Sequence, residues 1–158
     1  MRIVVAPEVR ADAGEVSRLV REAFGELAGP DAEVHVIRAS RGAQPFTGLA
    51  FPEPPNRKMA PGARYLVRLR LPSILRNRGY PMTHRYRGRK TAPWITVRNW
   101  QERLVALAAH EACHVRQFRD GTRRSEVEAE RHAAAVLAAW VETRTTSPQG
   151  LAQLTLAF

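Results

Sequence analysis

The string His110-Glu111-Ala112-Cys113-His114 constrains this chain more than any other feature, because its H-E-x-x-H pattern gains meaning only on a helix. Residues four apart on a helix share one face, with Cβ atoms about 5–6 Å apart. Two imidazoles so placed can hold one Zn²⁺ at Zn–N distances of about 2.0–2.1 Å. Glu111 can then take a proton from a water that the metal activates.

The sequence around this string predicts a helix. Residues 99–119 contain no Gly or Pro and are rich in Ala, Leu, Arg and Gln, which are good helix formers. We expect Asn99 to cap the helix and Asp120-Gly121 to end it. Helical spacing places five residues on one stripe, with both histidines at its margin: Leu104, Leu107, Glu111, Val115 and Phe118. The alternative, two histidines merely packed or solvated on an ordinary helix, leaves Glu111 on an apolar stripe without a purpose.

A zinc peptidase usually has three protein ligands, so a third must come from elsewhere. Ser125 and Glu128 fit a capping box that begins a second helix, predicted to run to about Trp140. Helical projection places Glu126 in the middle of its apolar face and Glu130 at the edge of that face. A carboxylate on an apolar face is unfavourable unless it is paired or bound to metal.

We therefore expect Glu126 to be the third ligand, and Glu130 to accept a hydrogen bond from a ligand histidine. The alternative interpretation of these acids is a favourable charge cluster at a helix N-terminus. It explains Glu128 well and Glu126 poorly.

The motif His110-Glu111-x-x-His114 followed by Ser125–Glu130 resembles the gluzincin pattern, and is similar to minimal gluzincins and ImmA/IrrE-type metallopeptidases. The resemblance spans Trp94 to about Trp140. It implies an α+β, zincin-like fold: a small twisted β-sheet packed on the H-E-x-x-H helix, followed by a second ligand-bearing helix. It also implies His110, His114 and Glu126 as ligands of one Zn²⁺ per chain, Glu111 as general base, and Glu130 as a supporting residue.

The chain departs from the gluzincin pattern in its short link, since only eleven residues separate His114 from Glu126. Asp120 therefore stays an alternative third ligand. Certain small zincins read H-E-x-x-H-x-x-G-x-x-[H/D], and here Gln117 stands at the glycine position. Cys113, the only cysteine, is expected to be a small packed residue rather than a ligand.

The remaining sequence predicts one domain, residues 1–143, followed by a C-terminal tail, residues 144–158. Alternation and apolar periodicity predict strands over 2–5, 33–38, 64–71 and 94–97, and a helix over 13–27 that Asp12 caps. Two long loops are expected, over 41–62 and 76–93.

By resemblance to zincins, the strand before the H-E-x-x-H helix is a candidate for binding substrate by strand addition. That strand comprises Trp94, Ile95, Thr96 and Val97, and an ordinary sheet strand is the alternative. Four residues are candidate donors to the oxyanion of a tetrahedral intermediate: Tyr65, Tyr80, His84 and Tyr86.

The net charge is +10, and 23 of the 25 basic residues are arginines, since only Lys58 and Lys90 are lysines. Such a surface would allow weak polyanion or nucleic-acid binding. The arginines are spread through the chain, however, which favours an ordinary solvated surface. The short apolar run at the N-terminus and the lack of a membrane-length apolar stretch lead us to expect a cytoplasmic protein with no membrane contact.

Two functions follow as hypotheses. The first is a zinc-dependent metallopeptidase that hydrolyses a peptide or protein substrate, with Glu111 as general base. The second is a zincin-fold metal-binding protein, regulatory or associated with nucleic acid, that has little proteolytic activity. Glu111 favours the first, because a structural zinc site needs no base.

Overall fold

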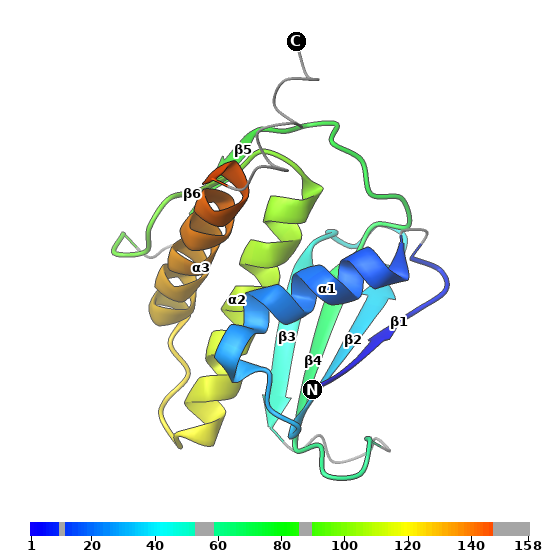
Figure 1. Cartoon of the computed structure of the whole chain (residues 1–158), viewed down its shortest axis with the longest axis vertical. Helices are drawn as coiled ribbons and strands as arrows, with labels where there is room; N and C mark the ends of the chain where they lie inside the picture. Colours follow the sequence, from blue (N-terminus) through cyan, green and yellow to red (C-terminus); the bar gives the residue numbers. More distant parts are fainter. Residues whose placement is uncertain (10–11, 53–58, 86–89, 147–158) are drawn as a thin grey trace.

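The fold is a mixed α+β arrangement in which three α-helices lie on one side of a four-stranded sheet (Figure 1). The computed structural model describes residues 1–9, 12–52, 59–85 and 90–146. The strands are β1 (Arg2–Val5), β2 (Ala32–Arg38), β3 (Thr47–Pro52), β4 (Tyr65–Leu71), β5 (Met82–His84) and β6 (Ile95–Val97). The helices are α1 (Ala13–Phe24), the 3₁₀ turn η1 (Gly25–Leu27), α2 (Trp100–Arg119) and α3 (Glu126–Thr146).

The main sheet has the order β1-β2-β4-β3. β1 and β4 both run parallel to β2, whereas β3 runs antiparallel to β4 and lies at one edge. Alternate residues of the central strands face the helices and are fully buried, among them Val34, Val36, Val67 and Leu69. The strands predicted over 2–5, 33–38 and 64–71 are confirmed to within a residue at each end.

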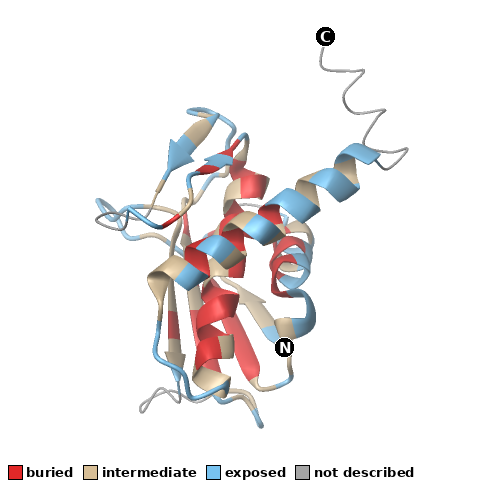
Figure 2. Ribbon diagram, turned by 90° about the vertical axis from the view of Figure 1, so that its left-hand side faces the viewer, coloured by how far each residue is buried: buried red, intermediate tan, exposed pale blue. Residues whose placement is uncertain are grey.

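α1 crosses the sheet, and its N-terminus is capped as predicted: Asp12 Oδ1 accepts hydrogen bonds from the backbone N–H groups of Gly14 and Glu15. The helix ends at Phe24, and the remainder of the predicted segment forms η1. α2 lies between α1, α3 and β3 and is buried around most of its circumference (Figure 2). This central helix carries the H-E-x-x-H string.

The ends of α2 and the start of α3 follow the predicted capping residues. Asn99 accepts a hydrogen bond from the N–H of Glu102 at 2.8 Å, and Asp120 caps the C-terminus of α2. Gly121 follows with φ of 63°, a conformation that glycine adopts without a Cβ penalty. Ser125 Oγ accepts from the N–H of Glu128 at 3.3 Å, so α3 begins at the expected place. α3 continues beyond Trp140 to Thr146.

The long loops predicted over 41–62 and 76–93 are wrong in part, because each contains a strand. β3 occupies Thr47–Pro52 and pairs with β4 along its whole length. Its sequence Thr-Gly-Leu-Ala-Phe-Pro includes a Gly and a Pro, which are tolerated at a sheet edge. β5 is three residues long and pairs with β6 in a separate two-stranded sheet. The predicted strand over 94–97 begins one residue later, at Ile95.

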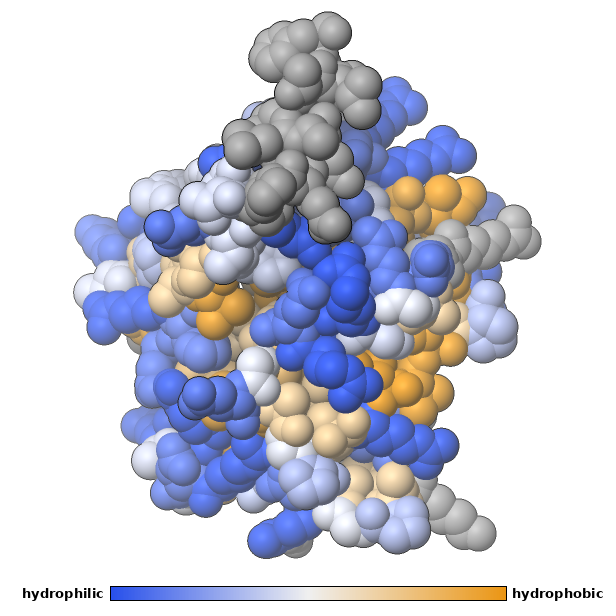
Figure 3. Space-filling model, in the orientation of Figure 1, coloured by the Kyte–Doolittle hydropathy of each residue, from blue (hydrophilic) through white to orange (hydrophobic). Residues whose placement is uncertain are grey.

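Hydrophilic side chains are distributed across the face that carries the helices, with apolar surface between them (Figure 3). Within the described parts of the chain, no helix has both the length and the apolarity that a membrane span requires.

Candidate metal centre

His110, His114 and Glu126 come together between α2 and α3 as a group that could hold a metal ion. His110 Nε2 lies 3.2 Å from His114 Nε2 and 3.2 Å from Glu126 Oε2. His114 Nε2 lies 3.5 Å from the same carboxylate oxygen. Three ligand atoms around a tetrahedral ion, at ligand distances of about 2.0–2.1 Å, are about 3.3 Å apart. The triangle formed by these three atoms therefore has the size that such an ion requires.

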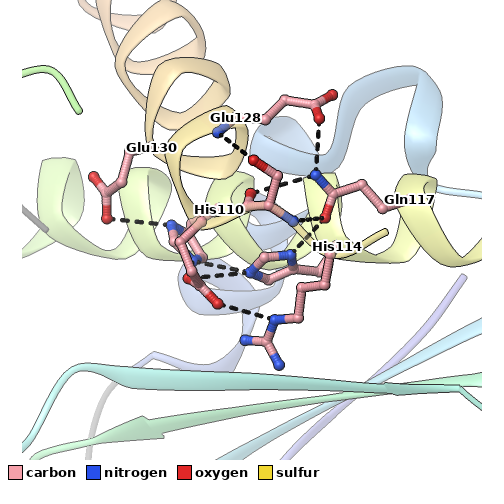
Figure 4. Close-up of polar contacts among 8 residues, drawn as sticks. His110, His114, Gln117, Glu128 and Glu130 are labelled. Carbon is pink, nitrogen blue, oxygen red and sulfur yellow. Dashed lines mark hydrogen bonds and ion pairs between the residues drawn. The ribbon is translucent and has the colours of Figure 1, made fainter. Parts of the chain in front are cut away.

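Hydrogen-bond acceptors behind the two histidines orient both rings toward this triangle. His110 Nδ1 faces Glu130 Oε1 at 3.3 Å, and His114 Nδ1 faces Gln117 Oε1 at 2.9 Å (Figure 4). Both partners accept hydrogen bonds from Nδ1, so the Nε2 atom of each ring is the one that faces the triangle. The two Nε2 atoms and the Glu126 oxygen converge, an arrangement that a bound cation would stabilise.

Glu130 occupies the position expected of a supporting residue. It lies on α3, one turn after Glu126, with its carboxylate beside the Nδ1 of His110 (Figure 4). Glu130 is 7% exposed, and its Oε2 has no hydrogen-bond partner among the described residues. A carboxylate behind a ligand histidine fixes the ring and raises the basicity of the ligand nitrogen.

Gln117 has the matching role behind His114 and was missed from the sequence. Its side chain is 1% exposed. Its Oε1 accepts one hydrogen bond from Nδ1 of His114 and another from the backbone N–H of Ser125 at 3.1 Å. Its Nε2 donates to Glu128 Oε2 at 3.0 Å and to the Ser125 carbonyl at 3.3 Å. One amide thus connects His114 to the start of α3, and thereby orients the helix that carries Glu126.

Glu128 does not complete the predicted capping box. Its carboxylate accepts hydrogen bonds from Arg116 at 2.6 Å and from Gln117, while the N–H of Ser125 is taken by Gln117. The capping box therefore gives way to a contact between the two helices. This contact allows a link of only eleven residues between His114 and Glu126.

Glu111 is 2% exposed and lies against β3. The backbone N–H of Ala50 donates a hydrogen bond to its carboxylate, whereas Oε2 is buried without a partner among the described residues. Burial raises the pKa of Glu111 to about 7, opposed by the charges of His110 and Arg124. A carboxyl group with such a pKa can both accept and release a proton near neutral pH.

A cleft of about 430 Å³ opens over these groups. Its lining includes Glu111, His110 and Glu126 from the two helices, Gly48 from β3, and His84 and Ile95 from the two-stranded sheet. Two members of the triad, His110 and Glu126, and the buried Glu111 therefore line one cleft, while His114 lies fully buried behind them.

Of the candidate oxyanion donors, only His84 lines this cleft among those that the structure describes. Tyr65 is buried and its ring stacks on that of Phe118, with centroids 6.5 Å apart. Tyr80 lines a neighbouring cavity. Tyr86 lies outside the described residues.

The other residues singled out from the sequence lie as follows. Asp120 is exposed at the C-terminus of α2 and is not part of the triad. Cys113 is fully buried, as expected of a packed residue. Of the segment Trp94–Val97, Ile95 lines the cleft, Val97 is buried, and Trp94 is 64% exposed before the start of β6.

Comparisons with protein-family models, with curated proteins and with solved structures each found no match for this chain.

Proposed function

We propose that the chain is a zinc-dependent metallopeptidase whose ion is held by His110, His114 and Glu126. The observation that carries this proposal is the position of Glu111, buried and only partly hydrogen-bonded, on the wall of the cleft that His110 and Glu126 also line. Two histidines and a carboxylate are a ligand set of catalytic zinc sites, which leave a coordination position open. A structural zinc site would be closed by a fourth protein ligand, and the described residues supply three.

Zn²⁺ bound here would supply Lewis-acid chemistry, polarising a peptide carbonyl and making a water molecule more acidic. Glu111 supplies the proton transfers: its carboxylate accepts a proton from the attacking water and delivers it to the departing amine. The N–H of Ala50 holds this carboxylate in place. His84, on β5, is the one of the described oxyanion candidates that lines the cleft, and we infer that it donates a hydrogen bond to the developing oxyanion.

The substrate backbone would lie along a strand at the cleft. β3 is an edge strand of the main sheet, and its Gly48 lines the cleft together with Phe46, which precedes the strand. Such an edge offers unpaired backbone groups for strand addition. The segment Trp94–Val97 is the second candidate, since Ile95 also lines the cleft. A peptide bound along either strand would have its scissile carbonyl close to the triad.

The proposal is tested by metal analysis together with a peptide-library digest. Purified, zinc-repleted protein should contain one zinc per chain and cleave members of the library, and Glu111→Gln should keep the zinc but lose cleavage. Zinc binding without any cleavage by the wild-type protein would favour a metal-binding regulatory protein instead. Absence of bound zinc would contradict both functions.

A further inference from the structure

A second cavity, of about 360 Å³, adjoins the metal cleft. The two spaces share Phe46, Met82 and Arg103 in their walls. The second cavity also contains Arg76, Arg78 and Tyr80, which come from the segment between β4 and β5. The two spaces are therefore neighbours, and a long molecule bound at the triad would come close to the second one.

The two spaces differ in charge. Three glutamates line the metal cleft: Glu111, Glu126 and Glu130. The second cavity has three arginines in its wall and no acidic residue among the described ones. Where the chain is described, Arg76, Arg78 and Arg103 form no ion pair with a carboxylate. A concave wall that carries several positive charges attracts an anion. Guanidinium groups bind carboxylates through paired hydrogen bonds.

Phe46 lies at the junction of the two spaces in a strained conformation. Its φ of 57° is in the left-handed region, which is unusual for a bulky residue. The guanidinium of Arg103 lies over its ring, 4.4 Å from the centroid. This contact holds the positive charge of Arg103 at the wall between the spaces. Backbone strain of this kind persists where the surrounding structure fixes it and is concentrated at functional sites.

The spacing along α2 relates this charge to the reacting bond. Arg103 precedes His110 by seven residues, or about 10 Å along a helix that rises 1.5 Å per residue. An extended peptide covers about 3.3 Å per residue. A substrate residue about three positions from the scissile bond would therefore reach Arg103.

We propose that this second cavity, the arginine pocket (Arg76, Arg78 and Arg103), binds an acidic side chain of the substrate about three residues from the bond that is cut. The inference rests on the proposed peptidase function and adds its specificity: the enzyme selects acidic peptides. A short carboxylate side chain suits a small cavity that adjoins the metal cleft, whereas a nucleic-acid backbone is bound along an extended basic groove.

The test is a binding measurement on the full chain carrying Glu111→Gln, which prevents turnover. The probes are a dansyl-labelled decapeptide with three glutamates and a sibling with glutamines in their place. The pocket variant is Arg76→Gln/Arg78→Gln, at two exposed positions. The matched control is Arg21→Gln/Arg131→Gln, which removes the same charge from exposed positions on α1 and α3.

We expect the glutamate peptide to bind about tenfold more tightly than its sibling, as charged hydrogen bonds allow. The pocket variant should lose most of this preference, and the control should keep it. Equal affinities for the two peptides, or equal losses in the two variants, would overturn the proposal. The proposal would also be overturned if a twelve-nucleotide oligothymidylate bound more tightly than the glutamate peptide and the pocket variant abolished that binding.

Metal-free protein separates this proposal from the peptidase proposal. The arginine pocket contains no metal ligand, so the glutamate preference should persist after zinc is removed. A wild-type protein that cuts no peptide but keeps the preference would refute the peptidase alone. A peptidase that cuts glutamate and glutamine peptides equally well would refute the pocket alone.

Discussion

Gly48 of β3 lies directly against the side chain of Glu111 on α2. A Cβ atom at Gly48 would fall 2.5 Å from Glu111 Cγ and 2.7 Å from its Cδ, closer than real Cβ contacts allow. Only glycine therefore lets β3 approach the helix closely enough for Ala50 to donate its N–H to the Glu111 carboxylate. The sheet edge and the proposed general base are positioned by one contact.

Substituting Gly48→Ala should reduce kcat/KM about 100-fold, because the new methyl group displaces Glu111 or moves β3. Zinc content should be unchanged, since Gly48 is not one of the three candidate ligands. Thr47→Ala, at the neighbouring position in the same strand, is the control and should retain activity. Steady-state kinetics and metal analysis of both variants make the comparison. Wild-type activity in Gly48→Ala would show that β3 does not position Glu111.

Two glutamates near the start of α3 should differ sharply in their effect on zinc. Glu126→Gln should weaken zinc binding by more than about 100-fold, beyond the 10–100-fold range typical of residues that merely support a ligand. Glu128→Gln should change the affinity by no more than about threefold, because residue 128 is outside the triad and a glutamine there can still accept hydrogen bonds from Arg116 and Gln117. Competition with a chromogenic chelator measures both. Equal effects of the two substitutions would remove Glu126 from the ligand set. A large loss of zinc affinity in Asp120→Asn would make Asp120 the third ligand instead.

Gln117 should influence zinc binding without being a ligand. Gln117→Leu removes the acceptor for His114 Nδ1 and the contacts with Ser125, so zinc affinity should fall about 10–100-fold. The double variant Gln117→Glu/Glu128→Gln keeps the acceptor for His114 and a donor–acceptor pair between positions 117 and 128, and should recover most of the affinity. The same chelator competition serves as the measurement. If both variants bind zinc as the wild type does, His114 does not depend on this support.

The ion pair between Asp31 and Arg119 should make stability depend on pH. Arg119 donates to both carboxylate oxygens of Asp31 and to the Leu27 carbonyl, connecting the start of β2 to the end of α2. The hydrogen bonds from Arg119 lower the pKa of Asp31. This stabilisation is therefore complete above the ordinary Asp pKa of about 3.9, and is lost as the pH falls through the lowered folded-state value.

Asp31→Asn should lower the free energy of unfolding at pH 7 by about 1–2 kcal/mol, a modest value because the pair is partly exposed. The difference from the wild type should shrink when urea denaturation is repeated near pH 3. A difference that is the same at both pH values would contradict the role assigned to this carboxylate.

Local sequence signals predicted the helices and the triad well. The caps Asn99 and Ser125 and the absence of Gly and Pro placed α2 and the start of α3, and helical projection placed Glu126 and Glu130 beside the histidines. These relationships depend on residues within a turn or two, where helical geometry determines which side chains meet.

Contacts between distant segments could not be predicted in this way. Gly48 resembles a loop glycine in the sequence, and its function appears only when β3 packs beside Glu111. The only sequence signal for Gln117 was its spacing, three residues after His114 on the same helix face. Its contact with Ser125 depends on the path of the turn between the two helices, which the sequence did not predict. β5 is too short for an alternating pattern to be recognised.

A crystal structure of zinc-soaked protein, with anomalous difference density measured on both sides of the zinc absorption edge, tests the central claim most directly. We expect one peak per chain, about 2.0–2.1 Å from His110 Nε2, His114 Nε2 and a Glu126 carboxylate oxygen, with Glu111 outside the coordination shell. A peak at another place, or one closed by a fourth protein ligand, would contradict a catalytic zinc site.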